Sequence, residues 1–292
     1  MKKIIAALLA IIILATVGLV GCSKTDDKKD ADKTTTEAAA YVVLDEALAA
    51  EEYAIGFRKA DLALCQEVER ILGEMKADGA LMILDEIWFG EEVNIFDATK
   101  AGTGATDDSL KKVKAAGKLV MGLDDSFPPM GYRDENNKIV GYDVDVATEV
   151  CVRMGVELVL QPIAWAAKEQ EINSGNIDCI WNGFTTTPER REALCMSTPY
   201  LTNSQVVVTL STSGIKTPAD LAGKTLAVQG GSSAMDALNS KPDIKAGLKG
   251  GAAVEVDNNV IAMFDLKSGG SDAVLMDKVV ADYYVAHPEA KK

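Results

Sequence analysis

Short apolar runs alternate with amphipathic stretches through much of the chain. Runs such as KLVMGL at 118–123 are rich in apolar residues, which predicts buried strands. The stretches between them carry helix signals, for example Thr187-Pro188 at a start and Gly175 at an end. Strands that alternate with helices favour parallel βαβ units with right-handed crossovers. This pattern predicts an α/β fold.

The alternation also indicates where a binding site lies. We expect strands at 118–123, 157–162, 177–181, 205–210, 225–228 and 273–276, and helices within 140–155, at 166–174, from 187, from 217 and at 278–286. In sheets of this kind, ligands bind beyond the carboxyl ends of the strands. Polar residues that directly follow a predicted strand are therefore the candidates for binding.

The composition excludes several classes of function. The length of 292 residues suggests about two domains. With 30 Lys and Arg against 44 Asp and Glu, the net charge is −14, which is unsuited to nucleic acid because that binding relies on basic side chains. His287 is the only histidine in the sequence, so a His-rich metal site or a Ser-His-Asp triad is not expected. We expect no metal and no cofactor.

The N-terminus has the features of an export signal. Lys2 and Lys3 precede a continuous apolar stretch at 4–20 that is short for a membrane-spanning helix. The stretch ends in Leu19-Val20-Gly21-Cys22, which resembles a bacterial lipobox. We expect a signal peptide at 1–21, cleavage before Cys22 and acylation of its thiol, for example with palmitate. The alternative is an uncleaved N-terminal anchor.

Both alternatives place the body of the chain outside the cytoplasmic membrane. Residues 22–40 are polar and charged, with too little apolar surface to order themselves, so we expect a flexible linker there. Several acyl chains would hold such a protein on the membrane stably.

Four further cysteines lie in the body of the chain, with no CxxC spacing to suggest zinc or thioredoxin-like chemistry: Cys65, Cys151, Cys179 and Cys195. Disulfides are possible in an exported chain. The apolar or helix-like surroundings of Cys65, Cys151 and Cys179 instead favour buried free thiols. We expect free cysteines, and the disulfide alternative stays open.

Polar residues follow four of the predicted strands. They are Asp124 after 118–123, Asn182-Gly183 after 177–181, Gln229-Gly230-Gly231-Ser232-Ser233 after 225–228, and Asp277 after 273–276. Glycines at Gly230-Gly231 let a ligand approach the backbone closely. Asp124 and Asp277 supply negative charge for a cation.

Arg190 supplies the complementary charge. It falls in the first turn of the helix that Thr187-Pro188 opens, where its guanidinium can grip a carboxylate with two bonds. Phe127 and Trp165 can flank a ligand side chain. One anion site beside separate acidic sites describes a receptor for a zwitterion. The alternatives are that Asp277 caps a helix, that Arg190 pairs with surface glutamates, and that the two aromatic residues belong to the core.

Several of these segments also resemble one known family. The stretch 118–130 (KLVMGLDDSFPPM), then Gly141-Tyr142-Asp143 and 182–190 (NGFTTTPER), look like the polar amino-acid binding proteins of ABC transporters, bacterial solute-binding protein family 3. Later, 228–233 (VQGGSS) and 272–277 (DAVLMD) match in the same order. The resemblance implies an α/β, two-lobe, type II periplasmic-binding-protein-like fold with two crossover strands.

The chain order departs from the family pattern. A Trp-Phe-Gly motif that normally closes such chains occurs here at Trp88-Phe89-Gly90, before the usual start. We therefore expect a circularly permuted order. Lobe 1 would comprise 58–96 plus 110–204, lobe 2 would comprise 41–51 plus 209–292, and 97–109 would be the permutation linker. The crossovers are expected near 52–57 and 205–208. The alternative is a duplicated C-terminal fragment before a truncated copy.

The resemblance also implies the role of each candidate side chain. Arg190, Thr185 and Ser232 would hold the α-carboxylate of an amino acid, close to the backbone at Gly231. Asp277, Gly183 and Thr185 would hold its α-ammonium. The remaining four would meet the ligand side chain: Asp124, Phe127, Trp165 and Asn182.

The expected function is that of a monomeric, lipid-anchored extracytoplasmic protein. It would capture a polar amino acid by closing two lobes and deliver it to the permease of an ABC importer. The alternative is an enzyme on the same fold, dehydratase-like, acting on a small carboxylic or amino acid. Arginine, lysine, histidine, glutamine and cystine all stay open as ligands.

Overall fold

Two mixed sheets organise the residues that the computed structural model describes, 40–288. The predicted signal peptide, Cys22 and nearly all of the predicted linker lie outside these residues. The sheet of lobe 1 has five strands in the order β10 (Leu194–Met196), β3 (Gly56–Arg58), β9 (Cys179–Ile180), β4 (Lys118–Leu123) and β8 (Glu157–Pro162). Strand β4 runs parallel to β8 and β9, whereas β3 is antiparallel to both of its neighbours.

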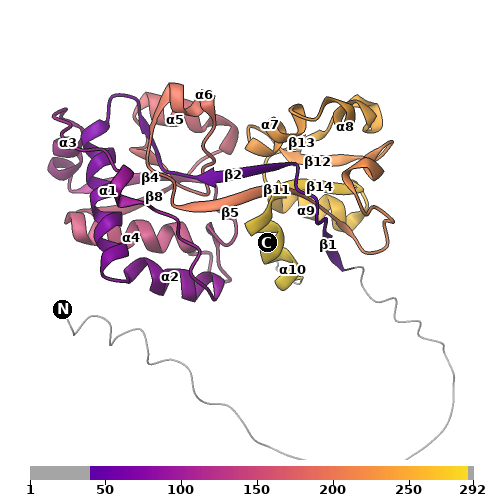
Figure 1. The fold of residues 1–292 in the computed structure, drawn as a ribbon, viewed down its shortest axis with the longest axis horizontal. Coiled ribbons are helices and arrows are strands. Elements are labelled where there is room, and N and C mark those ends of the chain that lie inside the picture. Colours follow the sequence, from indigo (N-terminus) through magenta and orange to yellow (C-terminus); the bar gives the residue numbers. More distant parts are fainter. Residues whose placement is uncertain (1–39, 289–292) are drawn as a thin grey trace, which may run out of the picture. The chain divides into compact units, whose positions relative to one another are not determined.

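Helices surround this sheet in lobe 1 (Figure 1). They are α1 (Leu62–Ala77), α2 (Ala80–Phe89), α3 (Ser109–Ala116), α4 (Tyr142–Met154), α5 (Lys168–Ser174) and α6 (Pro188–Ala193). Short 3₁₀ turns lie at η2 (Ala98–Lys100) and η3 (Trp165–Ala167), and a small antiparallel sheet is formed by β5 (Ser126–Phe127), β6 (Gly131–Arg133) and β7 (Ile139–Val140).

The sheet of lobe 2 has six strands. Its order is β1 (Tyr41–Val43), β11 (Leu201–Leu210), β14 (Ala273–Asp277), β12 (Leu226–Gln229) and β13 (Val254–Val256), with β2 (Ala49–Tyr53) also paired to β11. Its helices are α7 (Ser233–Asn239), α8 (Pro242–Gly247), α9 (Asn259–Ser268) and α10 (Lys278–Ala286), with 3₁₀ turns η4 (Pro218–Leu221) and η5 (Lys249–Gly251).

Two antiparallel strands, β2 and β11, run side by side between the lobes (Figure 1). They pair from Leu201↔Tyr53 to Gln205↔Ala49. The predicted second crossover at 205–208 is misplaced, because all four of these residues pair with β14 inside the sheet of lobe 2. The stretch that leads from one lobe to the other is the earlier half of β11, beside β2.

The segment from residue 41 to residue 96 contributes to both lobes. Strand β1 joins the sheet that contains β14, while β3 joins the sheet of lobe 1. Helix α1 packs against α3 and α4 of lobe 1. This N-terminal segment is therefore built into both sheets.

Most predicted elements are found within a residue or two of their expected bounds. Three expectations need correction. The sheets are mixed, because β11, β3 and β10 run antiparallel to their neighbours. The strand expected at 177–181 has only two residues in β9, although the N–H groups of Asp178 and Trp181 still bond carbonyls of β4. The helix expected from 217 is the 3₁₀ turn η4, which begins with a Thr217–Asp220 capping box.

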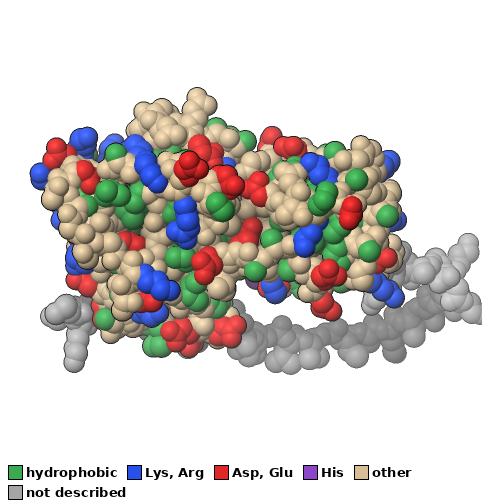
Figure 2. Space-filling model, turned by 45° about the horizontal axis from the view of Figure 1, so that its top comes forward, with side chains coloured by type: hydrophobic (Ala, Val, Ile, Leu, Met, Phe, Trp, Pro, Cys, Tyr) green, Lys and Arg blue, Asp and Glu red, His purple; other side chains and the backbone are tan. Residues whose placement is uncertain are grey.

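The distribution of surface charge and the state of the cysteines were also compared with the expectations from the sequence. On the face that Figure 2 shows, Lys and Arg are interspersed with Asp and Glu. The four cysteines of the body are free thiols, as expected. Among residues 40–288, no helix is both long enough and apolar enough to cross a membrane.

Candidate ligand-binding site

The strand ends of both lobes meet at one small enclosed cavity of about 10 Å³. This is room for about a single water molecule. Gln229 and Ser233, which had not been assigned to the ligand, line this cavity. So do seven of the ten predicted ligand-binding residues, which are Phe127, Trp165, Gly183, Thr185, Arg190, Ser232 and Asp277.

Arg190 is held in this cavity by the start of α6. Thr187 caps the helix by accepting a hydrogen bond from the Arg190 N–H (3.2 Å). The guanidinium lies over the Phe184 ring, 4.4 Å from its centroid, and Nη1 donates to the Thr185 carbonyl (2.8 Å). The residue is only 9% exposed, so it is not a surface side chain.

The Arg190 charge is influenced by the carboxylates of Glu169, Asp236, Glu51 and Asp277, but only from beyond ion-pair distance. Among the described residues, no Asp or Glu oxygen forms an ion pair with it. Burial lowers the pKa of this guanidinium, because desolvation disfavours its charged form. A buried cation without a counter-ion is unfavourable. An anionic group placed at this cavity would therefore be stabilised.

Asp277 provides the opposite charge. It sits at the junction of β14 and α10, and its carboxylate makes no capping bond to that helix. Its Oδ1 instead accepts from the Tyr53 hydroxyl and from Asn203 Nδ2, both at 2.7 Å. Burial raises the pKa of Asp277 to about 7, and the nearby charge of Glu51 adds to this.

Glu51 on β2 is a second acid at this place, and it was not among the predicted residues. Its Oε2 accepts hydrogen bonds from Thr185 Oγ1 (3.0 Å), Asn203 Nδ2 (3.1 Å) and Gln205 Nε2 (2.9 Å). Among residues 40–288, neither Glu51 nor Asp277 has a Lys, Arg or His within ion-pair distance. Two neighbouring carboxylates without a cation favour a positively charged group from a ligand.

Besides the bond from Thr185 to Glu51, three further side-chain contacts join the lobes around the cavity. Gln229 Nε2 donates to Asp124 Oδ2 (2.7 Å), and Ser233 Oγ donates to Thr185 Oγ1 (3.1 Å). Lys168 Nζ donates to the Gly231 carbonyl (2.7 Å). Each contact pairs a residue of lobe 1 with a residue of lobe 2, so the lobes touch directly at the site.

The other three predicted residues do not line the cavity. Asp124 binds the N–H and hydroxyl of Ser126 through Oδ1 and Gln229 through Oδ2, so both of its oxygens have partners. Asn182 Oδ1 accepts from the Asp124 N–H (3.0 Å), and its buried Nδ2 has no hydrogen-bond partner. Gly231 lies beside the cavity and uses its carbonyl to bind Lys168.

Two of the predicted residues, Gly183 and Ser232, line the cavity but have local structural roles as well. Gly183 has φ +55°, and an added Cβ would lie 2.8 Å from the Phe127 ring, so only glycine fits there. Ser232 lines the cavity, but its hydroxyl bonds back to the Gln229 carbonyl (2.7 Å). The next residue, Ser233, is the one whose hydroxyl reaches Thr185.

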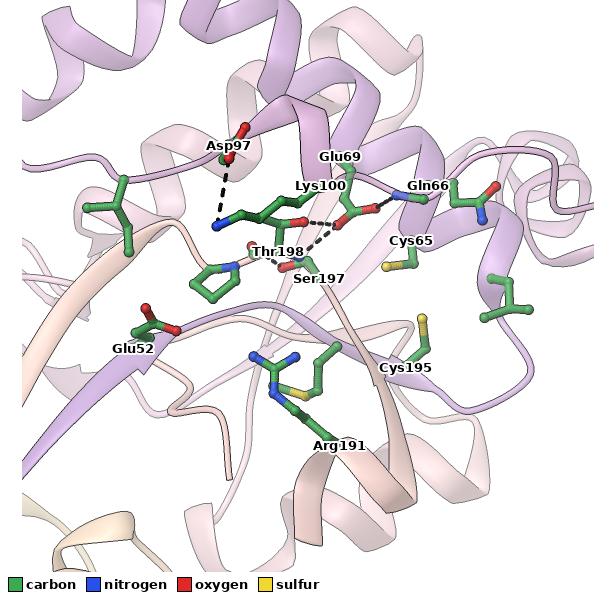
Figure 3. A pocket seen from close by; sticks show the side chains of 15 residues that line it. Glu52, Cys65, Gln66, Glu69, Asp97, Lys100, Arg191, Cys195, Ser197 and Thr198 are labelled. Atoms are coloured by element: carbon green, nitrogen blue, oxygen red, sulfur yellow. Dashed lines mark hydrogen bonds and ion pairs between the residues drawn. The ribbon is translucent and has the colours of Figure 1, made fainter. Parts of the chain in front are cut away.

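A larger cavity, about 470 Å³, lies in lobe 1 between α1, the segment near Lys100 and β10 (Figure 3). Glu69 in its wall already accepts bonds from Thr198 and Gly102, and Lys100 pairs with Asp97 (3.7 Å). The other charged side chains in its wall, Glu52 and Arg191, are exposed, unlike the buried Arg190 and Asp277 of the site between the lobes. Among the described residues, no cluster of three or more His, Cys, Asp or Glu could hold a metal ion.

Comparison with known proteins places the chain in a family. Residues 119–279 match the family of bacterial extracellular solute-binding proteins, family 3. The chain belongs to this family. Its fold is accordingly that of the two-lobe, type II solute-binding proteins, as expected.

Curated relatives include the L-cystine-binding protein TcyJ of Escherichia coli (strain K12), 31% identical over 179 residues. That match covers 61% of this chain and 65% of the relative, so the chain spans just under two thirds of that protein's length. The ABC transporter arginine-binding protein 1 of the same organism is 30% identical over 172 residues, 59% of this chain and 68% of the relative.

Solved structures of similar proteins contain amino acids. A substrate-binding protein of an ABC uptake transporter from Streptococcus pneumoniae, with bound histidine, has a TM-score of 0.61 and 37% identity. The match covers 64% of this chain and 76% of that one. Holo ArgBP from T. maritima has a TM-score of 0.56 and 38% identity over 61% of this chain and 77% of that one.

Proposed function

We propose that this family-3 protein binds a polar α-amino acid between its lobes and delivers it to an ABC importer. One observation carries the proposal. The same cavity is lined by Arg190, a buried cation, and by Asp277, which lies beside Glu51, and among the described residues none of the three is in an ion pair. The charges of Glu51 and Asp277 act on Arg190 only from beyond ion-pair distance. An α-amino acid bound between them supplies a direct partner for each charge. The relatives and neighbours named for cystine, arginine and histidine support the same class of ligand.

The α-carboxylate is assigned to Arg190, with the hydroxyls of Thr185 and Ser232. The Arg190 guanidinium has five N–H donors, of which one already binds the Thr185 carbonyl. The others include the pair needed for a two-bond grip on a carboxylate.

The α-ammonium is assigned to Asp277, with Gly183 and Thr185. Glu51 extends the acidic end of the site, since it shares Asn203 with Asp277. Phe127, Trp165, Asp124 and Asn182 are assigned to the ligand side chain, with Gly231 giving close backbone approach. Gln229 joins this group because it holds Asp124 across the lobes.

The proposal is tested by identifying the ligand. Mass spectrometry of the purified full chain should detect a co-purified α-amino acid. Calorimetry with arginine, lysine, histidine, glutamine and cystine then ranks the candidates. For the tightest of them, the α-amide and the N-acetyl derivative serve as controls, because each removes one charge of the zwitterion. We expect both derivatives to bind much more weakly. Equal binding of either derivative would contradict the two-ended site.

No enzymatic activity is proposed. The relatives and structural neighbours named above are binding proteins, and an Arg–Asp clamp for a zwitterion needs only to bind. The bound amino acid should therefore be recovered unchanged after long incubation with the protein. Conversion of the ligand would favour the dehydratase-like alternative.

We propose export and lipid anchoring from the N-terminal sequence. Lys2-Lys3, the apolar stretch and Leu19-Val20-Gly21-Cys22 support cleavage before Cys22 and acylation of its thiol. The family is described as extracellular, which agrees with export. Mass analysis of protein from native membranes should find lipid on an N-terminal Cys22. A retained Met1 with an unmodified Cys22 would contradict it.

We also propose that the chain is monomeric and circularly permuted, with 97–109 as the joining segment. The permutation is supported by β1 and β2 pairing with β11 of lobe 2, while β3 and α1 lie in lobe 1. A separate domain for 41–96 would not pair with both sheets. A duplicated fragment is disfavoured, because each of its strands completes a sheet built from the later chain.

A further inference from the structure

Two cysteines from different elements face each other in lobe 1. Cys65 lies on α1 and Cys195 on the edge strand β10. Their sulfur atoms point toward one another in the wall of the 470 Å³ cavity (Figure 3). Cys65 is 3% exposed, and Cys195 is half-buried. The pair is therefore adjacent, and it is reached from the cavity on the Cys195 side.

We propose that Cys65 and Cys195 form a reversible disulfide that ties α1 to β10. The oxidant is a low-molecular-weight disulfide. The Cys195 thiolate attacks one of its sulfurs and releases a thiolate, which takes up the proton that Cys195 gave up. The Cys65 thiolate then attacks Cys195 Sγ and releases the second external thiolate, which takes up the proton from Cys65. Two protein thiols are oxidised, and one external disulfide is reduced to two thiols.

The environment of the pair gives the two thiols different roles. The thiol–thiol hydrogen bond raises the pKa of Cys65 and lowers the pKa of Cys195. The positive charge of Lys59 also favours the Cys195 thiolate, whereas burial and the carboxylates of Glu69 and Asp61 oppose it. The attacking sulfur is the thiolate. Cys195, the more accessible of the two, is accordingly the attacking residue, and Cys65 completes the bond.

The other two cysteines of the body serve as internal controls. Cys151 and Cys179 are buried, and burial raises the pKa of Cys151 to about 12 and that of Cys179 as well. Thiols whose pKa is raised chiefly by burial react slowly. For Cys65 the first cause is instead its hydrogen bond to Cys195, which is lost once Cys195 has reacted with the external disulfide. Oxidation of the folded chain should therefore be confined to one pair.

The bond would act on a part of lobe 1 that leads to the crossovers. Strand β10 pairs with β3, and β3 follows the crossover strand β2. The segment after β10 continues into β11. Because Cys65 and Cys195 are far apart in the sequence, their bond would also restrict the unfolded chain strongly. Oxidation should therefore raise the melting temperature.

The experiment uses the full chain, reduced and then exchanged into oxidised glutathione at neutral pH. Remaining thiols are blocked with N-ethylmaleimide present during unfolding, and the peptides are then mapped. We expect one linked peptide pair, Cys65–Cys195, with N-ethylmaleimide on Cys151 and Cys179. The melting temperature should rise on oxidation in the wild type and in the matched control C151S, but not in C195S.

Peptide mapping of the wild type decides the proposal without relying on any variant. If Cys65 and Cys195 both remain reactive to N-ethylmaleimide after oxidation, the pair does not form a disulfide. Stable glutathione adducts on Cys195, or links from either residue to another cysteine, would also overturn it. Reversal by dithiothreitol, with recovery of both thiols and of the lower melting temperature, is expected.

Discussion

Replacing Arg190 with alanine should weaken the binding of every α-amino acid that the chain takes. The guanidinium is 9% exposed and has no ion-pair partner among the described residues. In the proposed complex its partner is the ligand α-carboxylate, which is common to all amino acids. The loss should therefore not depend on the ligand side chain.

The size of the loss follows from the burial of this charge. Removing one partner of a buried, hydrogen-bonded charge pair costs about 2–5 kcal/mol, because the other charge stays buried and unpaired. At about 1.4 kcal/mol per tenfold change in Kd, the variant should bind about 30- to 4,000-fold more weakly.

The stability of the unliganded protein should change much less. The variant loses the contact between Arg190 and the Phe184 ring, worth about 0.5–2 kcal/mol. It also loses the unfavourable burial of an unpaired cation, which acts in the opposite direction. A large loss of affinity with a nearly unchanged melting temperature would separate a binding role from a structural one.

Calorimetry with the cognate amino acid measures the effect, and Arg191→Ala is the matched control. Arg191 is the next residue on α6, is exposed and does not line the site between the lobes. The control should bind as the wild type does. If Arg190→Ala keeps its Kd within about threefold, or about 0.7 kcal/mol, of the wild type, the carboxylate assignment is wrong.

The remaining predictions concern the acidic end, the ligand side chain and the chain order. Asp277→Asn should weaken all amino acids by about 2–5 kcal/mol in calorimetry, whereas the exposed Asp282→Asn should not. Because burial raises the pKa of Asp277 to about 7, affinity should rise about tenfold per pH unit up to about pH 7 and then level off, and Asp277→Asn should lose this dependence. Asp143 has its pKa raised to about 7 by burial as well, so the unliganded chain binds more protons folded than unfolded and should lose stability from about pH 4 to pH 7 in thermal melts. Asp124→Asn should reorder the ranking of amino acids in a calorimetric panel rather than weaken all of them alike. Deleting 41–96 should abolish folding, seen as loss of a cooperative melt, whereas moving this segment behind residue 288 should preserve folding and binding.

The helix that carries Arg190 was predictable because its determinants are local. Thr187 and Pro188 define where α6 starts, and the hydrogen bond from the Arg190 N–H to Thr187 is made within one turn. The strand at 118–123 was predictable for a similar reason, because its apolar run has the bounds of β4. Determinants within a few residues of one another were sufficient for both.

The crossover boundary could not be predicted in the same way. Residues 205–208 are an apolar extended run, and such a run suits a crossover and a sheet strand equally. Their partner β14 lies about 70 residues later in the chain and makes them part of lobe 2. Pairing between distant segments decided the outcome, and local pattern does not contain it.

Glu51 was missed because nothing beside it in the sequence marks it as part of a site. It lies in the short strand AAEEY, and its partner Thr185 is 134 residues away. One usable signal was the alternation of Glu51 with Tyr53, since residues two apart share a face of a strand. Tyr53 reaches Asp277, so an acid on the same face of a crossover strand was a reasonable candidate.

The start of α7 shows a finer limit of prediction. Ser232 and Ser233 are equivalent by residue type, and only Ser232 was assigned to the ligand from the sequence. In the structure the Ser232 hydroxyl bonds back to the Gln229 carbonyl, and Ser233 Oγ reaches Thr185 across the lobes. The orientation of the first turn of α7 determines which of the two adjacent serines faces Thr185. The residue types alone do not determine that orientation.

The contacts between the lobes must change when a ligand enters. The cavity of about 10 Å³ is far too small for an amino acid, and binding pockets for small molecules typically measure about 300–1,000 Å³. Entry therefore requires the lobes to separate, as in hinge closure around ligands. The hinge is available in β2 and the first half of β11, the two strands that lead between the lobes.

The hydrogen bonds between the lobes are weak enough to be replaced by bonds to a ligand. The bond from Ser233 across the lobes is worth about 0.5–1.5 kcal/mol net, and the bonds of Gln229 to the Asp124 carboxylate and of charged Lys168 about 1.5–3 kcal/mol each. Their sum, about 3.5–7.5 kcal/mol, is comparable to the few kcal/mol that separate interconverting states. A ligand that bridges Arg190 and Asp277 adds charge-assisted bonds in which both partners are charged. The ligand thus stabilises closed lobes more than the protein's own contacts do, which is the difference in affinity that closure requires.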